Sequence, residues 1–101
     1  MELKKLSDIE IITTSNSKIN EVDFENLTFG NVFTDYMLVC DFENGAWQKP
    51  IITPYAPFLL DPSAKVFHYG QAIFEGMKAF KDNQDDVWLF RLDENFNRFN
   101  K

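Results

Sequence analysis

The sequence lacks the residues that several common functional classes require. It has a single cysteine and a single histidine, which excludes an internal disulfide framework and a metal site built from several such ligands. Its four glycines are too dispersed for a phosphate-binding loop, and no apolar run approaches the length of a membrane span. The start of the chain also lacks a signal-peptide pattern. We therefore expect a cytoplasmic protein with neither a metal site nor a membrane partner.

The charge balance excludes one further class of partner. The chain carries 10 Lys plus Arg against 16 Asp plus Glu, a net charge of −6, and its basic residues form no cluster longer than Lys4-Lys5. Nucleic-acid backbones attract basic surfaces, so we expect no nucleic-acid partner. Eleven phenylalanines within a 45% hydrophobic composition make burial of a core feasible, although 101 residues bury only a modest fraction of their surface.

The chain begins with a polar stretch and continues into a β-rich one. Residues 1–26 lack a sustained period, and we expect them to be extended or poorly ordered, with a short strand near Ile11 and a loop over 13–18. Residues 32–42 alternate as a strand with two mostly apolar faces, which predicts a cover on each side. Asn44-Gly45 tolerates positive φ, and residues 47–53 resume the extended pattern, which predicts a β-hairpin.

The second half mixes helices with a second hairpin. We expect a helix over 67–75 that ends at Gly76, then strands over 77–81 and 87–91 joined by a polar turn. Asp93 is expected to cap another helix, within which the sequence stops at Lys101. Because natural domains seldom stop two turns into a helix, this pattern indicates a piece of a larger domain. The predicted fold class is α+β, with antiparallel β-hairpins and flanking helices.

The segment richest in chemical groups is His68-Tyr-Gly-Gln-Ala-Ile-Phe-Glu-Gly76. An isolated histidine such as His68 is more often structural than catalytic. Tyr69 and Phe74 would ordinarily be core aromatics. They lie about 140° apart on a regular helix, so they could line one pocket only if the helix ended near Phe74. Glu75 could cap a helix, pair with a cation or act in a site, and a structural role is expected.

Two arginines and one cysteine complete the candidates. Arg91 and Arg98 can each bind a phosphate or carboxylate through two parallel hydrogen bonds, which lysine cannot copy. For an arginine whose place in the fold is unknown, a surface salt bridge is the more common outcome. Cys40 lies in an apolar run, which favours a small buried hydrophobe over a nucleophile.

Several motifs, taken in order, resemble those of branched-chain amino acid aminotransferases. They cover about residues 27–101, and their order makes the match much more specific than any one of them. They are Phe29-Gly-Asn-Val-Phe-Thr-Asp-Tyr-Met37, Gly45-Ala-Trp-Gln-Lys-Pro50, Leu60-Asp-Pro-Ser-Ala64, Val66-Phe-His-Tyr-Gly-Gln-Ala-Ile-Phe-Glu-Gly-Met-Lys-Ala-Phe80, Leu89-Phe-Arg91 and Asn95-Phe-Asn-Arg98. Tyr36 is a departure, because the family often has histidine there. Its place on a predicted strand implies an effect on packing rather than on chemistry.

The resemblance implies a fold, an activity and a cofactor. Family members are similar in being fold-type-IV enzymes with a small N-terminal and a large C-terminal domain. Residues 27–101 would then be part of the small domain, and the large catalytic domain would be absent from this chain. The family uses pyridoxal 5'-phosphate to exchange the amino group of leucine, isoleucine or valine with 2-oxoglutarate, giving a branched 2-oxo acid and glutamate. The resemblance also implies a homodimer for the complete enzyme.

Carried over residue by residue, the resemblance assigns roles to four side chains. Arg98 matches the arginine that binds the cofactor phosphate. Phe29, Tyr69 and Phe74 match aromatics that line the pocket for the branched side chain, and an apolar wall suits such substrates. The family's Schiff-base lysine lies beyond Lys101, and none of the eight lysines here is in the matching context. The chain is therefore expected to hold no catalytic residue and to be inactive alone.

Two other interpretations stay open at this point. Other fold-type-IV enzymes, such as D-amino acid aminotransferases or aminodeoxychorismate lyases, usually resemble Gly-Asp-Gly-x-Phe-Glu where this chain has residues 69–75. The Phe-Thr-Asp signature favours the branched-chain enzymes, although fold alone never settles a substrate. The alternative from a different class is a non-catalytic interaction or oligomerisation module, favoured by the missing lysine and the many aromatic residues.

Overall fold

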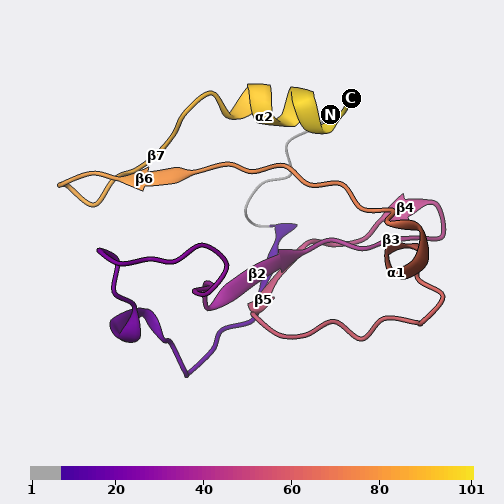
Figure 1. The fold of residues 1–101 in the computed structure, drawn as a ribbon, viewed down its shortest axis with the longest axis horizontal. Coiled ribbons are helices and arrows are strands. Elements are labelled where there is room, and N and C mark those ends of the chain that lie inside the picture. Colours follow the sequence, from indigo (N-terminus) through magenta and orange to yellow (C-terminus); the bar gives the residue numbers. More distant parts are fainter. Residues whose placement is uncertain (1–7) are drawn as a thin grey trace. The chain divides into compact units, whose positions relative to one another are not determined.

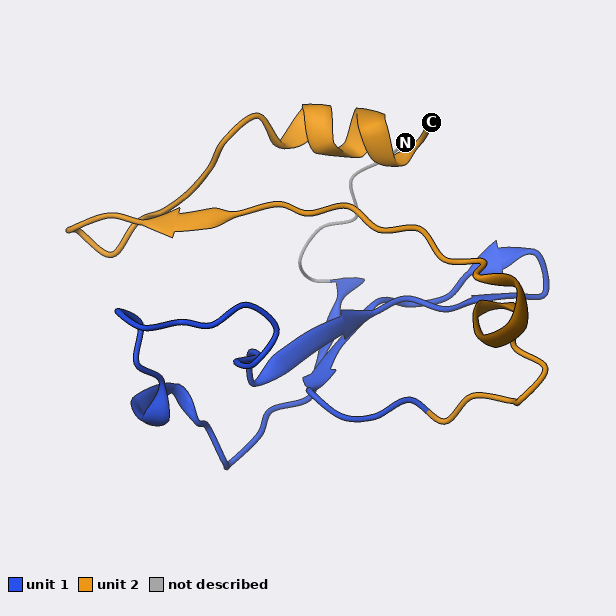
Figure 2. Cartoon of the chain, viewed as in Figure 1, with its two compact units in different colours: residues 1–58 blue, residues 59–101 orange. Residues whose placement is uncertain are grey.

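A computed structural model describes residues 8–101, which form two compact units. One unit comprises the residues up to Phe58 and the other comprises Leu59–Lys101 (Figure 2). Short sheets and helices alternate along the chain (Figure 1), so the predicted α+β character is confirmed. The proposed boundary between residues 26 and 27 stays a prediction, and part of the first segment lies outside the described residues.

A three-stranded sheet forms the centre of the first unit. Its strands are β1 (Glu10–Ile11), β2 (Tyr36–Val39) and β5 (Ile51–Pro54), in the order β1-β5-β2. β2 runs antiparallel to β5, whereas β1 runs parallel to it. The predicted short strand near Ile11 and the hairpin between the two longer strands are thus confirmed.

The turn of this hairpin forms where the Asn-Gly dipeptide predicts it. β3 (Phe42–Glu43) pairs with β4 (Ala46–Trp47) across Asn44 and Gly45, which have φ angles of 53° and 78°. Two successive positive φ angles give a turn whose twist matches that of the flanking strands. The rings of Phe42 and Trp47 meet edge to face across the pair, with centroids 5.2 Å apart.

The strand predicted over residues 32–42 is shorter than expected. Regular pairing begins at Tyr36, because the Thr34 hydroxyl donates a hydrogen bond to the backbone carbonyl of Tyr36. The Asp35 carboxylate accepts hydrogen bonds from the Ser17 hydroxyl at 2.6 Å and from the Lys18 backbone N–H at 3.0 Å. The preceding loop, predicted over residues 13–18, is thereby held against the start of β2. The Thr34 hydroxyl, which bonds backbone two residues away, competes with strand pairing, whereas the Asp35 backbone carbonyl still accepts a hydrogen bond from the Tyr55 N–H at 2.9 Å.

The second unit contains a short helix that ends earlier than predicted. Helix α1 spans Lys65–Tyr69, and Gly70 closes it in the left-handed conformation with φ 58°. The predicted helix over 67–75 ending at Gly76 is therefore wrong. Both glycines are helix C-terminal signals, and the first one along the chain stops the helix. Phe74 consequently lies outside any helix, so the helical spacing of Tyr69 and Phe74 no longer constrains them.

The second hairpin and the last helix complete this unit. β6 (Ala79–Lys81) pairs with β7 (Val87–Leu89), as predicted but over fewer residues. Asp82 closes the turn by accepting a hydrogen bond from the Trp88 indole N–H at 2.8 Å. Helix α2 spans Leu92–Phe99 and is preceded by Arg91 at φ 49°, so the prediction that Asp93 caps it is wrong. Asp93 instead lies in the first turn, where a negative charge is still favourable.

None of the described residues is fully buried, so the predicted cover on both faces of the first long strand is not present. Tyr36, Met37 and Val39 of β2 are half-buried and Leu38 is 59% exposed, so neither face of this strand is fully covered. Cys40 is likewise half-buried rather than buried, and its thiol donates a hydrogen bond to the Gln48 carbonyl at 3.3 Å. None of the helices in residues 8–101 is long and apolar enough to cross a membrane.

Candidate functional site

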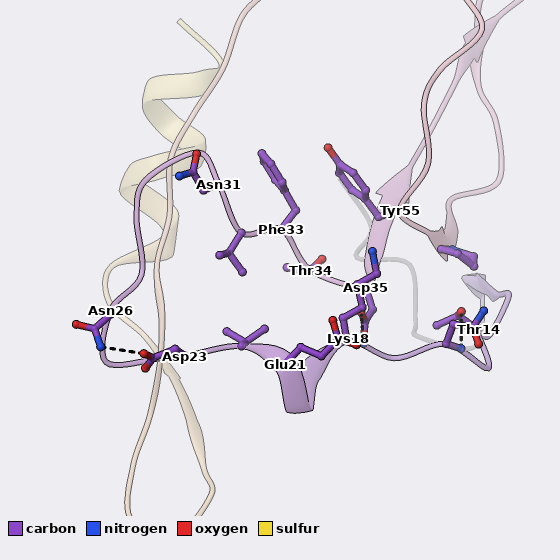
Figure 3. Close-up of a pocket in the computed structure, with 14 residues that line it drawn as sticks. Thr14, Lys18, Glu21, Asp23, Asn26, Asn31, Phe33, Thr34, Asp35 and Tyr55 are labelled. Atoms are coloured by element: carbon purple, nitrogen blue, oxygen red, sulfur yellow. Dashed lines mark hydrogen bonds between the residues drawn. The ribbon is translucent and has the colours of Figure 1, made fainter.

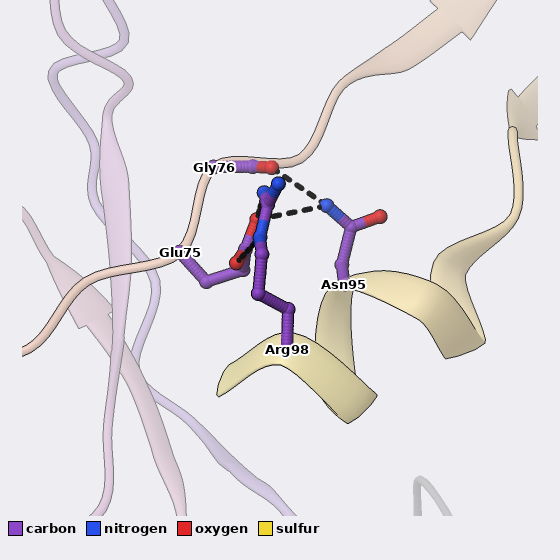
Figure 4. Close-up of polar contacts among 4 residues, drawn as sticks. All are labelled: Glu75, Gly76, Asn95 and Arg98. Carbon is purple, nitrogen blue, oxygen red and sulfur yellow. Dashed lines mark hydrogen bonds and ion pairs between the residues drawn. The ribbon is translucent and has the colours of Figure 1, made fainter. Parts of the chain in front are cut away.

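Helix α2 carries two polar side chains to one segment of the second unit. Asn95 and Arg98 lie one turn apart on α2, and both reach Glu75 or its neighbour Gly76, as Figure 4 shows. Residues three apart on a helix project from the same face, which explains how both side chains reach one target. The contacts span 19 to 23 residues of sequence, so they fix α2 to the segment that precedes β6.

The ion pair between Glu75 and Arg98 is the strongest polar contact of this cluster. The Arg98 Nε donates to Glu75 Oε2 at 2.6 Å, and Arg98 Nη2 donates to Glu75 Oε1. Asn95 Nδ2 donates to Glu75 Oε1 at 3.0 Å and to the Gly76 carbonyl at 2.8 Å. Both oxygens of the Glu75 carboxylate thus accept hydrogen bonds from one guanidinium, a bidentate geometry that arginine forms and lysine cannot.

The two partners of the pair differ in exposure. The Glu75 side chain is 7% exposed, whereas the Arg98 side chain is 70% exposed. The acid is therefore the anchored member, and the cation presents its remaining surface to solvent. Arg91, the other arginine, makes a weaker contact, with its Nη2 3.7 Å from Glu94 Oε1 and both side chains exposed. Only Arg98 departs from the surface salt bridge expected of an unplaced arginine.

Hydrogen bonds from Arg98 are the largest reason why the pKa of Glu75 is lowered from 4.5 to about 2. The Asn95 amide and the Gly76 backbone N–H act in the same direction, and desolvation acts against them. The same pairing raises the pKa of Arg98. Both groups are therefore ionised at neutral pH.

The ion pair predicts a specific acid sensitivity. Because the pKa of Glu75 is lower in the fold than its ordinary value, the pair stabilises the fold above pH 4.5, and this contribution disappears as pH falls towards about 2. Urea unfolding of the complete protein should therefore show a shallower loss of stability over this range for Glu75→Gln than for the parent. Equal slopes would mean that Glu75 is not paired there.

An open hollow of about 290 Å³ lies beside Arg98. Its lining residues are Phe90, Arg91, Glu94, Asn95 and Arg98. Two of these side chains are cationic and one is anionic, and the Glu75 carboxylate that pairs with Arg98 offsets the remaining positive charge. Arg98 is the predicted site residue at this hollow, and the N–H groups that Glu75 does not occupy can donate hydrogen bonds to an anionic group there.

The predicted pocket aromatics are all exposed, and they do not line the hollow beside Arg98. Phe29 is 104% exposed at the second position of a turn, in which Gly30 follows at φ 80°, a conformation that favours glycine. Tyr69 is 77% exposed at the end of α1, and Phe74 is 92% exposed next to the anchored Glu75. Phe29 belongs to the first unit and the others to the second.

His68 has the structural role expected of an isolated histidine. Its Nε2 lies 3.1 Å from the Pro62 carbonyl oxygen, a contact that spans six residues and tethers α1 to the segment before it. No group of three or more histidine, cysteine, aspartate or glutamate side chains in residues 8–101 could hold a metal ion.

A larger hollow of about 540 Å³ lies in the first unit, shown in Figure 3. Phe33 and Tyr55 stack beside it with ring centroids 5.4 Å apart. Two of its three carboxylates have partners: Asp35 binds the loop over residues 17–18, and Asp23 binds Asn26. None of the predicted site residues lines this hollow, and its acidic wall disfavours an anionic ligand.

Sequence reasoning missed Asn95 and the role of Asp35. Asn95 stands three residues before Arg98, and that spacing on a predicted helix places the two side chains on one face. Asp35 belongs to the Phe-Thr-Asp signature, and its contacts with Ser17 and Lys18 give that acid a structural role in holding the N-terminal loop. No sequence signal links Asp35 to residues 17 and 18, because the pairing depends on the path of the loop.

Comparison with known proteins identifies close relatives. No protein-family model matches the chain. Branched-chain-amino-acid transaminase 1 of Bacillus subtilis is 55% identical over 80 residues, which cover 78% of this chain and 22% of that protein. Branched-chain-amino-acid aminotransferase 2 of the same organism is 42% identical over 99 residues, covering 97% and 26%. The cytosolic branched-chain-amino-acid aminotransferase of Saccharomyces cerevisiae is 43% identical over 97 residues, covering 94% and 25%.

These matches extend the sequence-based interpretation in one respect. A match that covers 97% of the chain must include most of residues 1–26, which the motif resemblance did not reach. The chain spans about a quarter of the length of the curated relatives that it matches. At 42 to 55% identity over most of its length, the chain is related to the branched-chain-amino-acid aminotransferases.

Proposed function

We propose that the complete protein is a pyridoxal 5'-phosphate-dependent aminotransferase that moves the amino group of leucine, isoleucine or valine to 2-oxoglutarate. The observation that carries this proposal is the identity of 42 to 55% with proteins named for branched-chain amino acid transfer. In this proposal the chain forms part of the small domain of a fold-type-IV enzyme. The complete protein is cytoplasmic and acts as a homodimer, with the Schiff-base lysine supplied by the large domain.

Arg98 is the residue that would hold the cofactor phosphate. Its guanidinium is anchored on one edge by Glu75, and its side chain remains 70% exposed beside the hollow lined by Arg98. Charge and donor geometry both suit a phosphate, which accepts parallel hydrogen bonds from arginine. When bound, pyridoxal phosphate supplies the electron sink for amino transfer. The part played by this chain is to bind and orient that group.

Phe29, Tyr69 and Phe74 would form the apolar wall for the branched side chain. Their exposure of 77% or more leaves their faces available for contacts that the complete protein provides. An apolar pocket separates substrates that differ by one methylene by only about 1–3 kcal/mol. We therefore expect leucine, isoleucine and valine all to be accepted, with modest preferences among them.

A substrate screen on the complete protein tests this function. Glutamate formation from 2-oxoglutarate should be seen with each of the three branched-chain L-amino acids and should require added pyridoxal phosphate after the cofactor is removed. D-Alanine and aminodeoxychorismate serve as the comparison substrates for the other enzymes of this fold type. Turnover of either one, with none of the branched-chain substrates, would replace the proposal.

A further inference from the structure

We propose that Glu75 is a positioning residue, which holds the Arg98 guanidinium so that its outer N–H groups are directed at a phosphate ester. This inference rests on the proposed function, because the phosphate is that of the cofactor. Glu75 itself touches neither the cofactor nor the substrate in this account. It acts through the arginine.

The division of hydrogen bonds supports the assignment. A guanidinium has five N–H donors in a fixed plane. Glu75 accepts from Nε and from Nη2, which occupies one edge of that plane. Three donors, on Nη1 and Nη2, remain on the outer side. A guanidinium whose one edge is already held by a carboxylate loses less conformational freedom when an anion binds its other edge.

The anchoring of Glu75 explains why it can serve this purpose. Its side chain is 7% exposed, and Asn95 binds both Glu75 Oε1 and the Gly76 carbonyl. The acid therefore cannot turn into solvent without breaking contacts with two side chains. Arg91 lacks such support, since its contact with Glu94 is 3.7 Å long and both partners are exposed.

The charge of Glu75 acts against its positioning effect, so the sign of a substitution is informative. A carboxylate beside Arg98 partly neutralises the cation, which by itself would weaken the attraction for a phosphate. A carboxylate that competed with the phosphate for Arg98 would lie on the solvent-exposed side of the guanidinium, where an anion approaches. Glu75 instead lies on the covered side, while Arg98 remains exposed. We therefore expect the positioning effect to exceed the charge effect, and removal of Glu75 to weaken phosphate binding.

The test compares two cofactor forms on the complete protein. Binding of pyridoxal phosphate and of pyridoxal, which lacks the phosphate, is measured on the cofactor-free parent and on Glu75→Gln. The expected result is a loss of about tenfold in affinity for pyridoxal phosphate, comparable to the loss of metal affinity when the hydrogen-bond partner of a metal-binding side chain is removed, with affinity for pyridoxal unchanged. Asp85→Asn is the matched control, because it removes an exposed carboxylate paired with Lys81 at 2.7 Å. Unchanged or tighter binding of pyridoxal phosphate by Glu75→Gln contradicts the proposal, as does an equal loss for both forms.

A double-mutant cycle with Arg98→Ala isolates the route of the effect. Once Arg98 is absent, Glu75→Gln should cause no further loss of affinity for pyridoxal phosphate, whereas an additive loss would mean that Glu75 acts by another path.

Should Glu75→Gln fold poorly, Asn95→Ala provides a second variant, because it keeps the ion pair but removes one contact that holds Glu75. A smaller loss of affinity, confined to pyridoxal phosphate, is then expected. If the parent transaminates and Glu75→Gln prefers pyridoxal phosphate over pyridoxal as strongly as the parent does, this inference alone is refuted. A parent that binds no pyridoxal phosphate refutes the proposed function as well.

Discussion

The isolated 101-residue chain will give no transamination above background with leucine, 2-oxoglutarate and pyridoxal phosphate. A Schiff-base lysine must lie beside the cofactor ring, and desolvation is one of the ways in which its amine becomes reactive. Every lysine in residues 8–101 is exposed to solvent, so none is desolvated within this chain. Lys4 and Lys5 lie outside the described residues and outside the motifs that match the family.

The measurement is glutamate production over time, at equal molar amounts of the isolated chain and of the complete protein. Pyridoxal phosphate without protein is the necessary control, because the free cofactor reacts slowly with amino acids. The complete protein should show cofactor-dependent turnover while the chain matches the protein-free control. Turnover by the chain that exceeds this control and is lost on heating would mean that one of its own groups performs the chemistry.

Replacing Arg98 by alanine in the complete protein should weaken cofactor retention by about ten- to a hundredfold, the range expected when a charge-assisted hydrogen-bonded pair worth roughly 1.5–3 kcal/mol is removed. Equilibrium dialysis of pyridoxal phosphate against the cofactor-free protein measures this change. Arg98→Lys should fall between parent and alanine, because it keeps the charge but loses the two-pronged geometry.

Two controls separate binding from folding in that experiment. Arg98→Ala leaves the covered Glu75 carboxylate without its main partner, so a lower melting temperature is expected as well. Affinity for pyridoxal, which has no phosphate, should stay close to the parent value if the fold is intact. Lys81→Ala removes a cation from an exposed pair on the second hairpin and should leave cofactor affinity unchanged. Normal retention of pyridoxal phosphate by Arg98→Ala would remove Arg98 from the cofactor site.

The parts of the fold that local chemistry determines were predictable from the sequence. Asn44-Gly45 specified the first hairpin, because few other dipeptides tolerate two successive positive φ angles. The polar turn that begins at Asp82 likewise marked the second hairpin, and the structure adds its hydrogen bond from Trp88. The extent of the first long strand was overestimated, since the Thr34 hydroxyl bonds the backbone of Tyr36 and the apolar pattern does not report this.

The contacts that build the candidate site were less accessible to sequence reasoning. Gly70 and Gly76 are equivalent stop signals locally, and only the fold shows that the helix ends at the first of them. Glu75 was recognised as able to pair with a cation, but its partner lies 23 residues away, beyond any local pattern. The assignment of Arg98 came from the resemblance, whereas its support by Glu75 and Asn95 came from the structure.

A crystal structure of the complete protein with pyridoxal phosphate and a branched-chain substrate analogue tests most directly whether Arg98 binds the cofactor phosphate. The expected result is an Arg98 nitrogen at hydrogen-bonding distance, about 3 Å, from a phosphate oxygen, with Glu75 still bound to its other edge. Phe29, Tyr69 and Phe74 should contact the branched side chain of the analogue. An Arg98 guanidinium directed away from the phosphate, with the three rings spread over separate surfaces, would contradict the account.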